Sequence, residues 1–242
     1  MGSQGAAVRL TGFTRRYGPQ TSVGPLDLTV EAGTCHGLVG ANGAGKSTIL
    51  RCLLGLDEAD EGDVLVLDRT PALGIPVSTA AGMIEEPAFF WWLDGPGNLR
   101  AAFPDRQITA GAIASVLAEV GLAEVEKLVV RKYSQGMRQR LGIARVLLAE
   151  PELVVLDEPT NGLDPFGIRW FRGLVSRLTA EGRTVLFSSH LLHEVQSACQ
   201  GFTMIDHGAV VAEGQTKDIH GYASLEDLYL SIAGGGKQAD ST

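Results

Sequence analysis

The stretch from Gly40 to Thr48, GANGAGKST, limits the possible fold of this chain more than any other feature of its sequence. It fits the pattern G-x-x-x-x-G-K-[ST], in which the glycines let backbone N–H groups curl around a phosphate with no Cβ in the way. An apolar segment (35–40) precedes it, and an apolar helix (49–56) is expected after it. A glycine-rich turn with a solvated lysine is the alternative, but this context favours a loop that binds a nucleoside triphosphate.

Every residue of this loop is a candidate for the nucleotide site: Gly40, Ala41, Asn42, Gly43, Ala44, Gly45, Lys46, Ser47 and Thr48. In such a loop the lysine, Lys46, reaches the β- and γ-phosphates, and the hydroxyl of Ser47 ligates Mg²⁺.

A run of apolar residues without polar alternation, LVVL (153–156), ends in Asp157 and Glu158. Such a run is typical of a central strand in a parallel sheet. Asp157 is placed to hold Mg²⁺ through water. Because adjacent residues at a strand end point in different directions, Glu158 is the candidate general base that polarises the attacking water. A helix-capping or solvated acid is the alternative for Glu158.

The other apolar patterns predict strands and helices in alternation. Strands are expected at 8–13, 26–30, 35–40, 62–68 and 184–189, and helices at 111–120, 165–180 and 191–199. The segment 70–110 is rich in proline, glycine and aromatic residues, and its pattern assigns no element. Strands separated by helices imply an α/β fold with a mostly parallel sheet.

The stretch YSQGMRQRLGIA (133–144) contains a helix start. Ser134 falls near the N-cap and Gly136 in the first turn, where free backbone N–H groups favour an anion. An ordinary cap that binds nothing is the alternative. The helix is indicated by a buried stripe with helical spacing, made of Met137, Leu141, Ala144 and Leu148.

Composition argues against some classes of partner and environment. The net charge of −8 argues against nucleic acid as the main partner, because the release of counterions requires a basic surface. No run of about 18 apolar residues predicts a membrane span, and the first ten residues, MGSQGAAVRL, do not resemble a signal peptide. The cysteines form no CxxC pair and are expected to be reduced thiols of a cytosolic protein: Cys35, Cys52 and Cys199.

Five motifs, taken in order, resemble the ATP-binding subunit of an ABC transporter. They are the phosphate loop (40–48), a signature helix start (133–137), the acidic strand end (153–158), a D-loop NGLDP (161–165) and a switch histidine in SSH (188–190). The resemblance covers the chain from about Val8 to Ile232. It implies a P-loop NTPase fold.

The resemblance also implies how the chain is organised. A single ATPase domain is expected over 6–232, with an N-terminal antiparallel β subdomain, a mostly parallel core sheet and a helical lobe inserted at about 87–150. Residues 233–242 are expected to form a disordered tail, because they lack large apolar residues.

In this family the signature helix start binds the γ-phosphate of an ATP molecule that the opposite subunit holds. The resemblance therefore assigns Ser134 and Gly136 to half of a composite site, which a two-fold dimer forms twice. Asp164, in the D-loop, would lie where the two subunits meet. The family's usual signature is LSGGQ, whereas here Gln135 replaces a glycine and Met137 replaces a glutamine. Loss of that glutamine amide is expected to weaken contacts to the ribose side of the partner's nucleotide.

Two further residues match positions of the family that contact nucleotide. His190 would contact the γ-phosphate and hold Glu158 and the water in line, with a surface histidine as the alternative. Tyr17, in RRYG, matches the aromatic residue that stacks on adenine, with a tyrosine packed on the sheet as the alternative.

The Q-loop of the family carries a glutamine, but MIEEP (83–87) stands in its place. Glu85 is the better match to the glutamine and Glu86 the alternative. A carboxylate at Glu85 can ligate Mg²⁺, although it adds negative charge beside the triphosphate. A glutamate here, combined with the S-x-G-M signature, resembles the drug- and bacteriocin-export branch.

Four aromatic residues follow the Q-loop directly: Phe89, Phe90, Trp91 and Trp92. In the family this region forms the groove that receives a short helix of the membrane subunit, and aromatic anchors suit such an interface. Burial in the core of the helical lobe is an equally weighted alternative.

The resemblance implies ATP and Mg²⁺ as cofactors, and a second ATPase subunit and an integral membrane permease as partners, with no nucleic acid. The chain is expected to be the motor subunit of an exporter, held at the inner face of the cell membrane through the permease. A relative acting on ribosomes or DNA is the alternative, but such relatives generally carry two ATPase domains or a long coiled coil. A P-loop kinase or GTPase leaves the signature helix, NGLDP and His190 unexplained.

Overall fold

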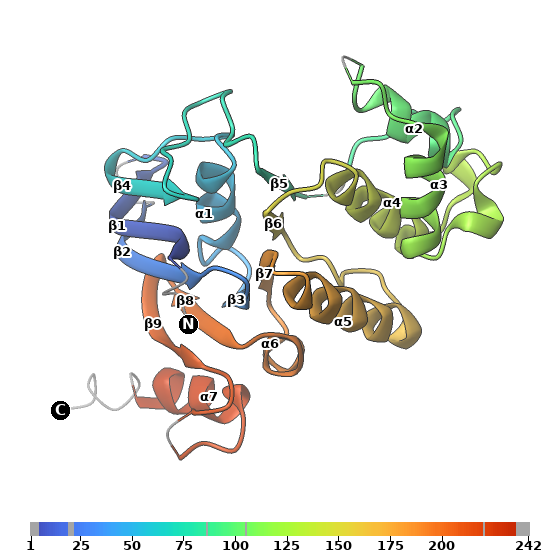
Figure 1. Cartoon of the computed structure of the whole chain (residues 1–242). Helices are drawn as coiled ribbons and strands as arrows, with labels where there is room; N and C mark the ends of the chain where they lie inside the picture. The colour runs from blue at the N-terminus through green and yellow to red at the C-terminus, as the bar shows by residue number, and fades with distance from the viewer. Residues whose placement is uncertain (1–4, 19–21, 86, 105, 220, 236–242) are drawn as a thin grey trace.

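The computed structural model describes residues 5–18, 22–85, 87–104, 106–219 and 221–235 (Figure 1). In this part of the chain the strands form two sheets. The smaller sheet is antiparallel and has three strands in the order β2-β1-β4. Its strands are β1 (Ala6–Arg16), β2 (Ser22–Glu31) and β4 (Glu61–Val66).

The larger sheet has six described strands in the order β5-β6-β7-β3-β8-β9. All neighbouring pairs are parallel except β8 and β9, which form an antiparallel pair. The strands are β3 (Cys35–Val39), β5 (Ala80–Met83), β6 (Leu153–Leu156), β7 (Thr184–Ser189), β8 (Gly201–Asp206) and β9 (Ala209–Gln215). The mostly parallel α/β fold predicted from the sequence is therefore confirmed.

Both faces of the central strands are buried, which explains why their sequences show no polar alternation. Along β6, Leu153 and Val155 join the core formed with the smaller sheet and α1 (Lys46–Leu53), whereas Val154 and Leu156 join the core on the opposite face. That second core also contains residues of α5 (Pro165–Ala180) and α6 (Leu192–Ala198).

Three helices gather beside this body, to the right of β5 and β6 in Figure 1. They are α2 (Gly95–Ala101), α3 (Ala110–Glu119) and α4 (Gln135–Leu147), joined by short 3-10 helices at Ala123–Val125 and Val130–Lys132. α4 also packs on β5, where a Cβ added at Gly142 would lie 2.5 Å from the Met83 sulfur. Among the described helices, none combines the length and the apolarity needed to cross a membrane.

The predicted elements lie close to those observed, with four differences. The helix expected at 49–56 is α1, which begins at Lys46 and ends at Leu53. The strand expected to end at residue 68 ends at Val66, since Leu67 and Asp68 adopt positive φ angles of 49° and 59°. The unassigned segment contains β5 and α2, and β8, β9 and α7 (Leu225–Gly235) were not predicted. Because α7 continues to Gly235, the tail expected from residue 233 was placed too early; residues 236–242 lie outside the described chain.

Candidate functional site

The phosphate loop joins the end of β3 to the start of α1, and two of its glycines, Gly40 and Gly45, leave no room for a side chain. A Cβ at Gly40 would lie 2.1 Å from the carbonyl oxygen of Ile205. Gly45 has φ +108°, and a Cβ there would lie 2.7 Å from a methyl group of Val23. The loop is therefore held as a backbone cradle of the kind that receives phosphate oxygens.

Lys46 lies inside this cradle and is only 5% exposed. Its Nζ donates hydrogen bonds to the carbonyl oxygens of Gly40 (2.7 Å) and Ala41 (3.2 Å). The same ammonium lies 3.4 Å from Oε1 of Glu158. The two groups form an ion pair, but their geometry does not meet that of a hydrogen bond. Within the described residues that Oε1 is buried and accepts no hydrogen bond, so a donor such as water suits it.

Asp157 and Glu158 follow β6 directly, and Ser188 of β7 orients both. The Ser188 hydroxyl donates to Oδ1 of Asp157 and accepts a hydrogen bond from the backbone N–H of Glu158 at 2.8 Å. Glu158 has φ +46°, a strained angle for a residue with a side chain. Such strain persists only where surrounding contacts hold it, and it is common at catalytic positions.

His190 is brought to Glu158 as the sequence predicts. Its Nδ1 lies 2.8 Å from Oε2 of Glu158, and its backbone N–H lies 3.4 Å from the same oxygen. Glu158 thus contacts Lys46 through one carboxylate oxygen and His190 through the other.

Tyr17 lies at the opening of the cavity that contains the phosphate loop, and its side chain is half exposed. Its hydroxyl lies 2.9 Å from Oδ2 of Asp57 and 3.3 Å from the Thr48 hydroxyl. The guanidinium of Arg15 lies 5.2 Å from the ring centroid. Burial acts to raise the pKa of Asp57, but hydrogen bonds from the backbone of Glu58 and from Tyr17, together with the charge of Arg15, lower it overall.

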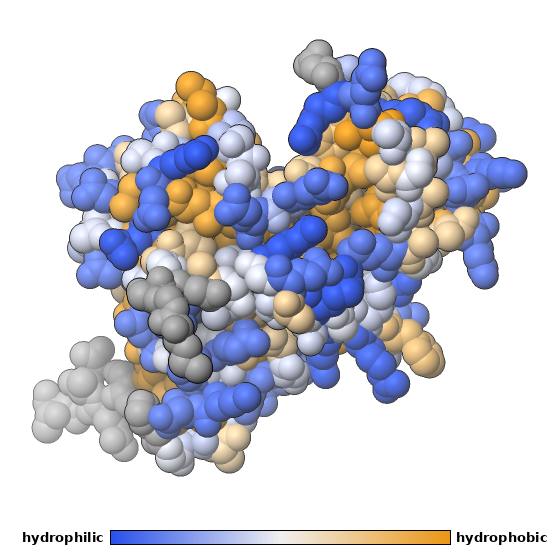
Figure 2. Space-filling model, viewed as in Figure 1, coloured by the Kyte–Doolittle hydropathy of each residue, from blue (hydrophilic) through white to orange (hydrophobic). Residues whose placement is uncertain are grey.

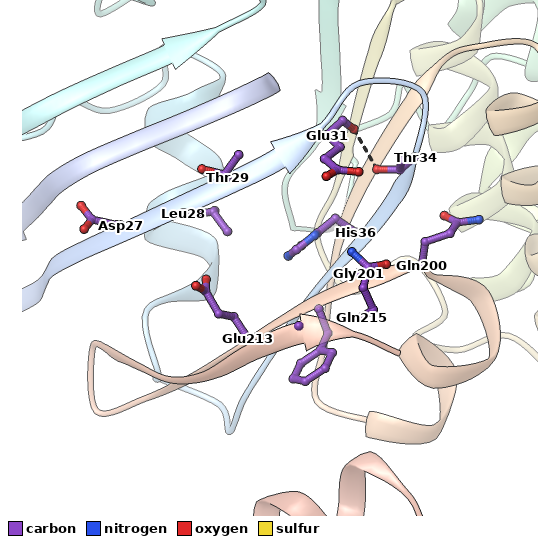
Figure 3. Close-up of a pocket in the computed structure, with 12 residues that line it drawn as sticks. Asp27, Leu28, Thr29, Glu31, Thr34, His36, Gln200, Gly201, Glu213 and Gln215 are labelled. Carbon is purple, nitrogen blue, oxygen red and sulfur yellow. Dashed lines mark hydrogen bonds between the residues drawn. The ribbon is translucent and has the colours of Figure 1, made fainter. Parts of the chain in front are cut away.

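The cavity at the phosphate loop has a volume of about 500 Å³ and is lined by Tyr17, loop residues, Glu158 and His207. A hollow of about 540 Å³ lies elsewhere, between β2 and β9 (Figure 3). The carboxylates of Asp27, Glu31 and Glu213 line that hollow, and their charges would repel a triphosphate. Burial there lowers the pKa of His36 to about 4, so this histidine is neutral at physiological pH. The cavity at the phosphate loop is therefore the candidate nucleotide site.

Glu85 follows β5 with φ +61° and forms an ion pair with Arg51 of α1. It lines a hollow of about 280 Å³ together with Asp157 and Glu158. Carboxylate and hydroxyl oxygens are the donors that Mg²⁺ prefers, and Mg²⁺ commonly uses one or two carboxylates plus phosphate oxygens. The predicted donors Ser47, Asp157 and Glu85 fit such an ion in chemical type; Glu86 lies outside the described residues.

Ser134 caps α4, and its hydroxyl accepts a hydrogen bond from the backbone N–H of Met137 at 3.2 Å. A Cβ at Gly136 would lie 3.3 Å from the carbonyl oxygen of Gly162, so the helix start adjoins the D-loop. In Figure 1, α4 and α1 lie on opposite sides of β5 and β6. The described residues that line the phosphate-loop cavity include none of 134–137, although Gln135 lines the hollow beside Asp157.

Asp164 is exposed and caps α5, where its Oδ1 accepts a hydrogen bond from the N–H of Gly167 at 2.7 Å. Three other contacts of the site were not predicted. Ser188 donates a hydrogen bond to Asp157, and Arg51 forms an ion pair with Glu85. The Nε2 of Gln139 lies 3.4 Å from the Glu158 carbonyl oxygen. The serine pair of SSH, at the end of an apolar strand, was the one available sequence signal for Ser188.

Comparison with known proteins agrees with this geometry. The family profile described as "ABC transporter" matches residues 23–161. The lantibiotic transport ATP-binding protein SrtF of Streptococcus pyogenes is 33% identical over 92% of this chain and 95% of its own length. The bacitracin transport ATP-binding protein BcrA of Bacillus licheniformis is 39% identical over 86% of this chain and 67% of its own length.

Solved structures share the fold. The structure of an ATP-binding subunit of an ABC transporter superposes with a TM-score of 0.83 and 28% identity, over 94% of this chain and 99% of that one. A dimeric ATP-binding cassette with bound ADP and phosphate superposes with a TM-score of 0.77 over 86% of this chain and 98% of that one. At 20% identity the second likeness shows the fold alone.

Proposed function

Because the chain belongs to the ABC transporter family as an ATP-binding subunit, we propose that it pairs with a second ATPase subunit around two ATP molecules and drives a separate membrane permease. Binding and hydrolysis of ATP are the activity of this family. The observation that carries the proposal is the position of Glu158, whose carboxylate contacts Lys46 and His190 at the phosphate-loop cavity.

In the proposed reaction, Glu158 accepts a hydrogen bond from the attacking water through its buried Oε1. It removes a proton as the water oxygen bonds to the γ-phosphorus and the bond from that phosphorus to the leaving ADP breaks. His190 holds the carboxylate through Oε2, which fixes the direction of the other oxygen. The Lys46 ammonium, which donates to loop carbonyl oxygens in this structure, would move to bind the terminal phosphates and stabilise their negative charge. Mg²⁺, held by Ser47, Asp157 and Glu85, would neutralise phosphate charge.

The second half of the site is proposed to come from the partner subunit. Ser134 and Gly136 lie at the start of α4, where backbone N–H groups have no acceptor within the helix, and that helix lies away from the phosphate loop of its own chain (Figure 1). Across a two-fold interface, this helix start would meet the γ-phosphate of the other subunit, with Asp164 at the contact. Gln135 and Met137 would adjoin the same nucleotide.

The surface proposed for the permease is the aromatic run. Phe90 and Trp91 are nearly half exposed, and Trp92 is 69% exposed, so core burial does not account for these three. It does fit Phe89, which is partly buried against the core. In Figure 2 apolar surface gathers over the α2–α4 region, beside a notch that separates it from the sheet region. A hollow of about 190 Å³ at Trp91 is also lined by Gln135 and Gln139 of α4, so a segment bound there would contact the signature helix.

Transport direction and location complete the proposal. The two relatives named above are transport ATP-binding proteins for a lantibiotic and for bacitracin. With the glutamate in the Q-loop, this supports export as the direction, while the permease selects the cargo. The chain would then be held at the inner face of the membrane by the permease.

Glu158→Gln tests the catalytic assignment. We expect ATP turnover to fall by at least about 100-fold, because an amide cannot take the proton, while binding of ATP to the chain persists. Turnover is measured as phosphate release and binding by equilibrium dialysis. Glu152→Gln is the matched control, since Glu152 is exposed and lies just before the same strand. Hydrolysis at the wild-type rate by Glu158→Gln would remove Glu158 from the role of base.

A further inference from the structure

Glu194 of α6 is a buried carboxyl group, only 2% exposed, in a position without an assigned function. Its Oε2 accepts hydrogen bonds from the hydroxyl of Thr160 and from the hydroxyl of Ser189, the latter at 3.1 Å. Within the described residues its Oε1 is buried without a hydrogen bond, and no lysine, arginine or histidine forms an ion pair with it. A carboxyl group buried at such cost needs a reason beyond packing.

The two hydroxyl groups belong to the two segments that flank the reacting carboxylate. Thr160 lies two residues after Glu158, just before the D-loop. Ser189 immediately precedes His190, and its Oγ also accepts a hydrogen bond from the N–H of Leu191 at 3.0 Å. One oxygen of Glu194 therefore joins the segment that carries the proposed base to the segment that carries its histidine partner.

We propose that Glu194 is a positioning residue for ATP hydrolysis. It acts through its neighbours: it fixes the distance between Glu158 and His190 by holding the segment next to each. The inference rests on the proposed roles of those two residues. It predicts that loss of the acceptor oxygen moves the carboxylate relative to the histidine, which slows the chemical step while ATP still binds.

Glu194→Leu and Glu194→Gln separate positioning from packing. In Glu194→Leu of the full chain we expect kcat to fall by about 10- to 100-fold with KM for ATP changed by less than about 2-fold. In Glu194→Gln the amide oxygen still accepts from both hydroxyls, and most of kcat should return. Ser197→Ala is the control on the same helix, because among the described residues its hydroxyl bonds to the backbone of His193, and it should keep the wild-type kcat.

Thr160→Val and Ser189→Ala each remove one hydrogen-bond donor to Glu194 and serve as the test if Glu194→Leu does not fold. If both act through Glu194, adding Thr160→Val to Glu194→Leu should produce no further loss of kcat. Unchanged turnover in Glu194→Leu, equal losses in the leucine and glutamine variants, or additive losses in the double variant would overturn the inference. Glu158→Gln, assayed in parallel, tests the proposed function separately: if it hydrolyses ATP normally, that function fails whatever Glu194 does.

Discussion

At the scale of single residues, the geometry of the phosphate-loop site depends on side chains that each contact more than one other residue. Glu158 meets Lys46 on one oxygen and His190 on the other, and Ser188 holds its backbone. Within the described residues, one buried oxygen of Glu158 lacks a hydrogen bond, and it lies where the proposed reaction needs a water.

The sequence motifs predict Glu158 and His190 as catalytic residues, but they give no sign of the residues that contact these two. Ser188 lies beside Asp157 because β6 and β7 pair with Leu156 opposite Phe187, and that register is a property of the sheet. Arg51 and Glu194 reach their partners from helices whose orientation also follows from packing. Such contacts join residues about 30 positions apart and leave no local pattern in the sequence.

His36 should make folding stability depend on pH. Burial lowers its pKa to about 4 from an ordinary value of about 6.5, so between these values the unfolded chain binds a proton that the folded chain does not. Stability should therefore fall as the pH falls from about 6.5 to about 4, by about 3 kcal/mol in total, and this effect should not grow below pH 4. Denaturant midpoints measured across this range give the slope.

His36→Gln should flatten the pH dependence over this window, whereas His207→Gln should leave it unchanged, because the His207 side chain is 95% exposed. Equal slopes in the wild type and in His36→Gln would show that His36 titrates normally in the folded chain.

At the scale of elements, apolar periodicity predicted most of the body of the fold. It succeeded for α4 and α5, whose buried faces repeat with helical spacing, and for β6 and β7, whose residues are all buried. It missed α2, a short helix with glycine, proline and asparagine in its first turn that begins at an Asp94 cap. It also missed β9, whose apolar residues (209–212) form a short run without alternation and whose last three residues are exposed.

The sheet and α6 also bring together two cysteines that are far apart in the sequence. The sulfurs of Cys35, at the start of β3, and Cys199, just after α6, lie 2.9 Å apart as buried free thiols. Burial raises the pKa of Cys199 well above its usual value and raises that of Cys52 to about 12. Thiolates are the reactive form, so both groups should be inert in the folded chain.

An alkylating reagent at pH 8 should therefore label less than one cysteine per folded chain within the time in which an unfolded control labels all three. Labelling is counted by intact mass. Rapid modification of Cys199 in the native chain would contradict the burial seen here.

At the scale of the whole molecule, the signature helix start and the aromatic run adjoin one another, whereas the described lining of the phosphate-loop cavity includes neither. α4 joins these two, because its residues line the hollow at Trp91 and its start carries Ser134. A permease segment bound at the aromatic run would therefore act on the helix that is proposed to contact the partner's nucleotide.

Trp92→Ala should weaken retention of the chain by its permease by about 10-fold or more, as expected for an exposed aromatic anchor, without changing ATP binding. The measurement is co-purification from native membranes at matched expression. Leu230→Ala is the control, because Leu230 is 65% exposed on α7. Equal retention of wild type and Trp92→Ala would place the permease elsewhere.

The central claim is that one chain holds two incomplete halves of a nucleotide site. Its most direct test is the mass by light scattering of Glu158→Gln with saturating ATP and Mg²⁺, alone and combined with Ser134→Glu. We predict twice the chain mass of 25.6 kDa for Glu158→Gln, and a single chain with ATP still bound when Ser134→Glu places a carboxylate where the partner's γ-phosphate must dock. An unpaired Glu158→Gln chain, or a wild-type chain that remains single while it hydrolyses ATP, would contradict the account.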